Sequence, residues 1–115
     1  LYRLAGAADL FLLPYPNLEQ VSSGTLSYAL PLGKAVLSTP FRHARAALAA
    51  GRGVLLPLEE EAWAQAVLAL AESPERLREM EERAYAYARD FTWPRVARAY
   101  RRLLEEVADV RPRVA

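Results

Sequence analysis

Small polar residues and a glycine lie between two apolar runs, and these are the residue types that could do chemistry. Segment 22–25 reads Ser-Ser-Gly-Thr and follows the apolar run Leu10–Leu13. A helix that begins after the carboxyl end of a parallel strand presents free backbone N–H groups and a positive dipole end, which together suit a phosphate. The segment therefore predicts a phosphate-binding helix start. Its members are Ser22, Ser23, Gly24, Thr25 and Leu26.

Further polar side chains flank this helix start. Glu19 and Gln20 lie in the preceding loop and could contact sugar hydroxyls, whereas Tyr28 could donate one hydrogen bond or stack. His43, the only histidine, follows the second apolar run and is expected to face the same crevice, with Arg42 beside it to neutralise phosphate charge. A lone histidine defines neither a metal site nor a catalytic triad, so we expect no metal and assign no catalytic residue.

Purely structural roles remain open for several of these candidates. Ser22 or Ser23 could serve as a helix cap and have no other role, because capping by itself explains a serine at that position. Glu19 can be a solvated loop acid. Tyr28 can lie in the core with its hydroxyl at an edge.

The composition is that of an ordinary globular domain. The chain has 115 residues, 53% hydrophobic and 25% charged, which leaves room for one domain and one core. The net charge of +1 predicts attraction to neither nucleic acid nor membrane. The lack of cysteine suits a reducing compartment, so we expect a cytoplasmic protein. If this chain is part of a longer protein, that protein could be peripherally bound to a membrane. Arginine in place of nearly all lysine is typical of a GC-rich genome and consistent with a thermophile.

The elements that must position the candidates alternate in the first half of the chain. Three continuous apolar runs are typical of strands buried on both faces. They are Leu10–Leu13, Ala35–Leu37 and Val54–Leu56. Helices are expected over 23–32 and 42–50, ended by Gly33 and Gly51 in the left-handed conformation. Strands that alternate with helices predict right-handed crossovers, a parallel sheet and a three-layer αβα fold of the α/β class.

The second half is expected to be helical over residues 59–110. Helix starts at Ser73 and Thr92, each followed closely by proline, divide it into three helices. Their apolar stripes are Trp63, Val67 and Leu70; Leu77, Met80, Ala84, Ala88 and Phe91; and Val96, Tyr100, Leu103 and Val107. Trp63 and Trp93 are expected in the core or against a domain outside this chain.

We expect the chain to be part of a longer protein. It begins without a methionine, and Leu1, Leu4 and Ala8 already fall on one face of a helix. Three strands are fewer than the roughly five or six of a typical sheet, so we expect further strands upstream. A sheet edge exposed by their loss would favour a homodimer. We expect the tail 111–115 to fray.

A set of residues along these elements stands in a recognisable order. They are Ala8-Asp9, Pro14, Glu19, Gly24, Tyr28-Ala29, Gly33, Ala35-Val36, Gly51–Leu55, Arg83-Ala84 and Phe91–Trp93. This order resembles the C-terminal, donor-binding half of GT-B glycosyltransferases, in the large retaining family of nucleotide-sugar enzymes (glycosyl transferases group 1, family 4-like). The resemblance spans nearly the whole chain. It implies that residues 1–115 are a partial C-terminal domain with a Rossmann-like GT-B fold.

The resemblance has one departure. The family carries a spaced pair of glutamates, of which the first is similar to Glu19, or to Gln20 if the loop is shorter. The second, which holds the ribose hydroxyls in the family, falls at Tyr28, which is not an acid. Segment 22–25 instead resembles the Ser-Gly-Thr turns of other GT-B enzymes, including the sugar-nucleotide epimerases.

The resemblance implies glycosyl transfer from a nucleotide-diphosphate sugar to an acceptor hydroxyl, with no separate cofactor. This chain would supply part of the diphosphate and sugar site, and an N-terminal GT-B domain would supply the rest. We therefore expect the chain alone to be inactive. Two alternatives stay open: a degenerate, non-catalytic GT-B binding or assembly module, and an epimerase-like GT-B enzyme.

Overall fold

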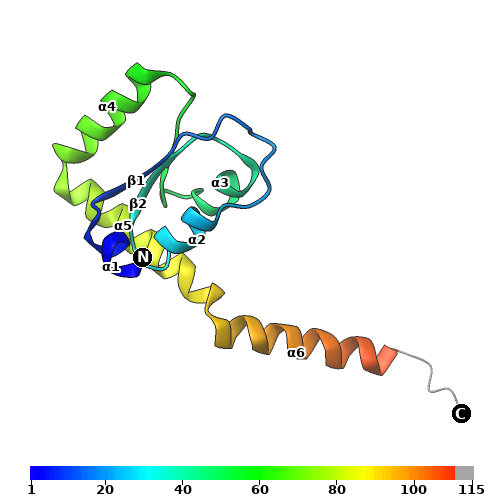
Figure 1. Cartoon of the computed structure of the whole chain (residues 1–115). Helices are drawn as coiled ribbons and strands as arrows, with labels where there is room; N and C mark the ends of the chain where they lie inside the picture. The colour runs from blue at the N-terminus through cyan, green and yellow to red at the C-terminus, as the bar shows by residue number, and fades with distance from the viewer. Residues whose placement is uncertain (111–115) are drawn as a thin grey trace, which may run out of the picture.

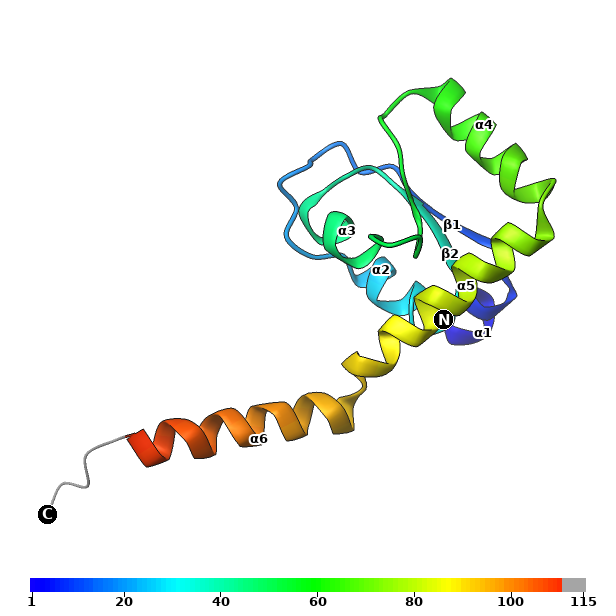
Figure 2. The same cartoon turned by 180° about the vertical axis from the view of Figure 1, so that it is seen from behind.

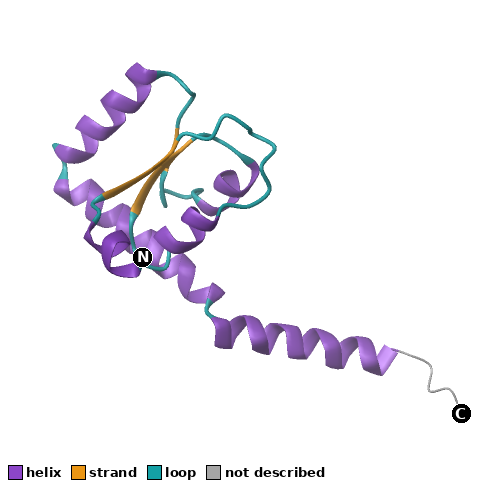
Figure 3. Ribbon diagram, viewed as in Figure 1, coloured by secondary structure: helices purple, strands orange, loops and turns teal. Residues whose placement is uncertain are grey.

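The computed structural model describes residues 1–110 as a parallel sheet with helices on both faces (Figures 1 and 3). The elements are α1 (Tyr2–Ala7), β1 (Leu10–Leu13), α2 (Gly24–Ala29), β2 (Ala35–Ser38), α3 (Arg42–Ala47), β3 (Val54–Leu55), α4 (Glu60–Ala71), α5 (Pro74–Ala88), a 3₁₀ turn (Arg89–Phe91) and α6 (Trp93–Val110). The predicted α/β class is confirmed. The tail 111–115 lies outside the described residues.

The sheet has the strand order β1-β2-β3, with both pairs parallel. Leu37 of β2 lies opposite Leu12 of β1 and Val54 of β3. All four residues of β2 are buried, as the continuous apolar run predicts for a central strand. Within residues 1–110, β1 and β3 are the outer strands of an open sheet.

Helices on both faces of the sheet enclose two apolar clusters, because successive side chains of a strand point to opposite faces. Val36 packs with α2 and α3 on one face, and Leu37 packs with α4 on the other. Helix α5 serves both clusters, through Met80 in one and through Ala84 and Ala88 in the other. The two clusters make the three-layer arrangement, and α2 and α3 share the layer that carries the candidate site.

The two helices of that layer are shorter than the sequence predicts. Helix α2 ends at Ala29, because Pro31 has no N–H to continue it and the Lys34 N–H donates instead to the Ala29 carbonyl at 3.1 Å. Gly33, at φ 65°, takes the predicted left-handed turn. The turn after α3 contains two residues with positive φ, the predicted Gly51 (74°) and also Ala50 (55°).

Helix α6 projects from the body of the molecule (Figures 1 and 2). The molecule as a whole, α6 included, measures 67 Å along its longest axis and 27 and 26 Å along the others. The 3₁₀ turn and the extended Thr92 (ψ 146°) redirect the chain before α6. Phe91 and Trp93 are consequently 59% and 87% exposed, so neither lies in the core of this chain; for Trp93 the alternative, contact with a domain outside the chain, stays a prediction. Trp63, in contrast, is half-buried and its indole N–H donates to the Pro57 carbonyl. Over residues 1–110, no helix combines the length and apolarity needed to cross a bilayer.

Candidate functional site

Ser23 is the N-cap of α2 and organises the start of this helix. Its extended backbone (φ −139°, ψ 121°) brings its Oγ to accept the Leu26 N–H at 3.2 Å. Its carbonyl accepts both the N–H and the hydroxyl of Ser27, at 3.1 and 2.9 Å. Of the two serines for which a capping role was open, Ser23 is the one that caps α2. The Leu26 N–H is therefore already used within the protein, and the Leu26 side chain is fully buried.

A hydrogen-bonded cluster of Tyr15, Ser23 and His43, called here the cap cluster, joins the starts of α2 and α3. The Tyr15 hydroxyl lies 3.1 Å from Ser23 Oγ, and the Ser23 N–H donates to Nδ1 of His43 at 3.1 Å. Thr39 Oγ1, at the carboxyl end of β2, donates to the Tyr15 carbonyl at 2.6 Å. These hydrogen bonds join the β1–α2 connection to the β2–α3 connection at the carboxyl edge of the sheet. This edge is where ligands of open α/β sheets bind.

The histidine of this cluster is neutral in its bonded form. Nδ1 of His43 can accept from Ser23 only as an unprotonated nitrogen, so the ring proton of this tautomer is on Nε2. Burial lowers the pKa of His43 from its ordinary value of 6.5. The imidazole can therefore donate one hydrogen bond from Nε2 near neutral pH without carrying charge.

Two backbone N–H groups at the start of α2 point to no protein acceptor. Within the described part of the chain, the Gly24 and Thr25 N–H groups take part in none of the hydrogen bonds, and both residues are exposed. A Cβ added to Gly24 would meet no atom within 4 Å, so neither packing nor backbone conformation requires glycine there. Free N–H donors at an exposed helix start are what an anion needs.

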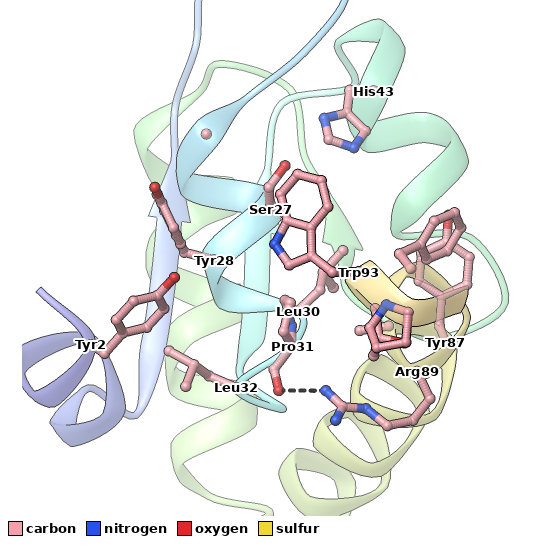
Figure 4. A pocket seen from close by; sticks show the side chains of 15 residues that line it. Tyr2, Ser27, Tyr28, Leu30, Pro31, Leu32, His43, Tyr87, Arg89 and Trp93 are labelled. Carbon is pink, nitrogen blue, oxygen red and sulfur yellow. Dashed lines mark hydrogen bonds between the residues drawn. The ribbon is translucent and has the colours of Figure 1, made fainter. Parts of the chain in front are cut away.

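A cavity of about 800 Å³ runs along α2 from this point (Figure 4). Its lining includes Gly24, Ser27, Tyr28 and His43 from the candidate region. Other lining residues come from elements distant in sequence: Tyr2, Leu30, Pro31, Leu32, Tyr87, Ala88, Arg89, Phe91, Thr92, Trp93 and Pro94. Aromatic rings dominate this wall, so the cavity suits a flat or apolar group more than a second charge.

Contacts with neighbouring side chains hold a pair of tyrosine rings and an arginine in place at the cavity wall. The rings of Tyr2 and Tyr28 meet edge to face at 5.6 Å on one side of the cavity. On the other side, the Arg89 guanidinium stacks over the Tyr85 ring at 4.1 Å and donates to the Pro31 carbonyl at 3.1 Å. Figure 4 shows Trp93 in front of α2 between these two sides, with His43 beyond it.

The loop before α2 carries the remaining candidates. The Arg42 guanidinium pairs with the Glu19 carboxylate at 3.1 Å, with both side chains largely exposed. Gln20 turns back to donate to the Ser22 carbonyl at 2.8 Å. These residues lie near the cap cluster in the chain but do not line the cavity.

Of the sequence candidates, Gly24, Tyr28 and His43 line the cavity. Those outside its lining are Glu19, Gln20, Ser22, Ser23, Thr25, Leu26 and Arg42. Sequence reasoning missed Tyr15 and Arg89, whose partners Ser23 and Pro31 lie 8 and 58 residues away along the chain. No periodicity or spacing marks such pairs. Among residues 1–110, no group of three or more histidine, cysteine or acidic side chains is placed to hold a metal ion.

The chain matches no protein-family model, no curated protein sequence and no solved structure.

Proposed function

We propose that this chain supplies part of the donor site of a GT-B glycosyltransferase, which transfers a sugar from a nucleotide-diphosphate sugar to an acceptor hydroxyl. The observation that carries the proposal is the pair of free N–H groups at Gly24 and Thr25. They lie at the carboxyl edge of a parallel sheet, and Gly24 borders the cavity. A diphosphate oxygen can accept from both groups, and the positive end of α2 adds to the attraction.

The neighbouring side chains suit the rest of such a donor. The Nε2 proton of neutral His43 can be donated to a phosphate or sugar oxygen. Tyr28, where the resembled family has a ribose-binding acid, offers one hydroxyl and a ring face. Negative charge builds on the departing diphosphate during glycosyl transfer, and fixed N–H donors stabilise it more in the transition state than in the ground state.

Turnover needs more than these residues. No acceptor site and no general base are assigned within the chain, so we expect it to bind donor without transferring sugar. A full enzyme would add an N-terminal domain across the sheet edge. In this proposal the protein acts in the cytoplasm, with membrane contact, if any, made by the rest of the protein.

The experiment is an amide NMR titration of the chain with UDP, GDP, ADP and their glucose or mannose conjugates. We expect the Gly24 and Thr25 amides to shift with the diphosphates, and His43 to follow when a sugar is attached. Gly24→Ala adds a methyl group beside these donors without a clash. It should therefore abolish the shifts at Thr25 while the fold is kept.

Gly6→Ala is the matched control, because Gly6 is also a helical glycine with no atom within 4 Å of an added Cβ and lies outside the cavity lining. It should leave the titration unchanged. Absence of shifts at Gly24 and Thr25 with every ligand, on a folded chain, would contradict the proposal.

A second candidate is a non-catalytic GT-B module for binding or assembly. Tyr28 in place of an acid favours it, as does the Glu19 carboxylate, which is engaged by Arg42. A stable oligomer that binds no nucleotide sugar would support this candidate. An epimerase-like enzyme of the same architecture would instead bind the nucleotide sugar and depend on catalytic acids in another part of the protein.

A further inference from the structure

The cavity beside α2 brings exposed aromatic rings together with one arginine. Tyr2, Tyr28, Phe91 and Trp93 line it and are all exposed, although large aromatic side chains are mostly covered in a folded domain. Trp93 is the most exposed of them, and within residues 1–110 its ring pairs with no other aromatic ring. At about 800 Å³ the cavity is within the size range of small-molecule sites, and such rings bind flat groups by stacking.

Arg89 is held in a fixed position on one side of this cavity. Its guanidinium carbon lies 4.1 Å from the centre of the Tyr85 ring, and Nη2 donates to the Pro31 carbonyl at 3.1 Å. Within residues 1–110 no carboxylate forms an ion pair with Arg89, and its Nε has no hydrogen-bond partner. Because Nε is buried, a ligand can reach this side chain only along its Nη1 and Nη2 edge. An arginine so placed is a preorganised donor for a flat group with two neighbouring acceptors.

The polar groups of the cavity favour a ligand that accepts hydrogen bonds on both sides. The free N–H of Gly24 and the Nε2 proton of neutral His43 are donors near the start of α2. Arg89 is a donor on the other side, and the lining contains no aspartate or glutamate. In the view of Figure 4 the Trp93 ring lies between His43 and Arg89. A nucleotide suits this order, because its phosphates and the edge of its base are acceptors and its ring is flat.

We propose that the cavity selects a guanine nucleotide, with guanine stacked on Trp93 and its O6 and N7 atoms accepting from Nη1 and Nη2 of Arg89. This inference rests on the proposed function, since the phosphates of the same nucleotide would lie at Gly24 and Thr25. A bidentate contact from arginine to O6 and N7 is the commonest specific contact that proteins make to guanine. Adenine has an amino group in place of O6, so two donors would meet there. Uracil offers a single acceptor, O4, on the corresponding edge.

NMR titrations of the wild-type chain with GDP, UDP and ADP measure this selection. The chain contains two tryptophans, so two indole N–H signals are expected. Trp63 is an internal reference, because its indole N–H donates to the Pro57 carbonyl and the residue lies outside the cavity lining. GDP should shift the Trp93 signal and bind about tenfold more tightly than UDP or ADP, which corresponds to one bidentate base contact. The Trp63 signal should stay in place.

Two substitutions separate base selection from stacking. Arg89→Lys keeps the positive charge but removes the two-donor edge, so the preference for GDP should fall to within about twofold. Arg78→Lys is the matched control, because Arg78 is an exposed arginine of α5 outside the cavity lining, and it should leave the preference intact. Trp93→Ala should weaken binding of all three nucleotides alike, by about fivefold or more, since every base can stack on an indole ring. An unchanged preference in Arg89→Lys would overturn the role of Arg89.

The possible results separate this inference from the proposed function. Equal affinities for GDP, UDP and ADP, with shifts at Gly24 and Thr25, would overturn guanine selection and leave the donor site in place. A shift of the Trp93 signal with GDP, and none at Gly24 or Thr25, would overturn the phosphate site and support the base contact alone. A Trp93 signal that stays in place with every nucleotide would overturn the inference, whatever happens at Gly24 and Thr25.

Discussion

The cap cluster makes a quantitative prediction for Ser23→Ala. The substitution removes the Oγ that accepts the Leu26 N–H and that contacts the Tyr15 hydroxyl, in a side chain only 4% exposed. Loss of a serine N-cap costs about 1 kcal/mol, and a part-buried hydroxyl left without its partner adds about another 1 kcal/mol. The free energy of unfolding should therefore fall by about 2 kcal/mol. For a chain of this length, that lowers Tm by about 8 °C.

Thermal and urea unfolding followed by circular dichroism measures this loss. Ser22→Ala is the control, because Ser22 is exposed and its side chain forms no hydrogen bond within the described structure. It should change stability by less than about 0.5 kcal/mol. A double-mutant cycle with Tyr15→Phe should give a coupling energy of at least about 0.5 kcal/mol for the hydroxyl pair. Equal effects of Ser23→Ala and Ser22→Ala would refute the capping argument.

Two further predictions concern the same layer of the fold. Because burial lowers the pKa of His43 below 6.5, the unfolded chain binds more protons than the folded one between the two pKa values. The free energy of unfolding should therefore fall as the pH drops below 6.5. The NMR signal of the one imidazole should titrate with a midpoint below 6.5, and the Ser23 amide signal should change with it. A midpoint at or above 6.5 would contradict this prediction. Gly53→Ala should destabilise the fold by about 1–3 kcal/mol in urea unfolding, because the added Cβ would lie 2.7 Å from both the Val36 carbonyl oxygen and a methyl of Leu48. An unchanged urea midpoint for Gly53→Ala would show that the two neighbours can move apart.

The sequence predicts the layers of this fold because each of its signals is local. A short apolar run such as Ala35–Leu37 between glycine and polar residues favours a strand covered on both faces. Gly33 favours a turn with positive φ, which other residues adopt at an energetic cost. The Ser23 cap is likewise a matter of a few neighbouring residues. Such features need no knowledge of distant segments.

The candidate site is less predictable because its contacts join distant positions. His43 meets Ser23 across 20 residues, and one histidine with one serine has no diagnostic spacing. For Phe91 the local signal is misleading, because an apolar stripe shows that a face needs covering but not which surface covers it. The 3₁₀ turn at Arg89–Phe91 directs Phe91 away from the core, whereas Met80, Ala84 and Ala88 of the same stripe are buried.

The loop between β1 and α2 is held by a few fixed points. The Tyr15 carbonyl accepts from Thr39, and the Leu18 carbonyl accepts the Arg42 N–H at 3.1 Å. Both anchors are main-chain carbonyls on the loop side, so they persist whatever side chains the loop carries. Exposed positions such as Val21 can therefore change freely between related sequences. Such a loop can change its exposed side chains during evolution while the scaffold beneath it stays the same.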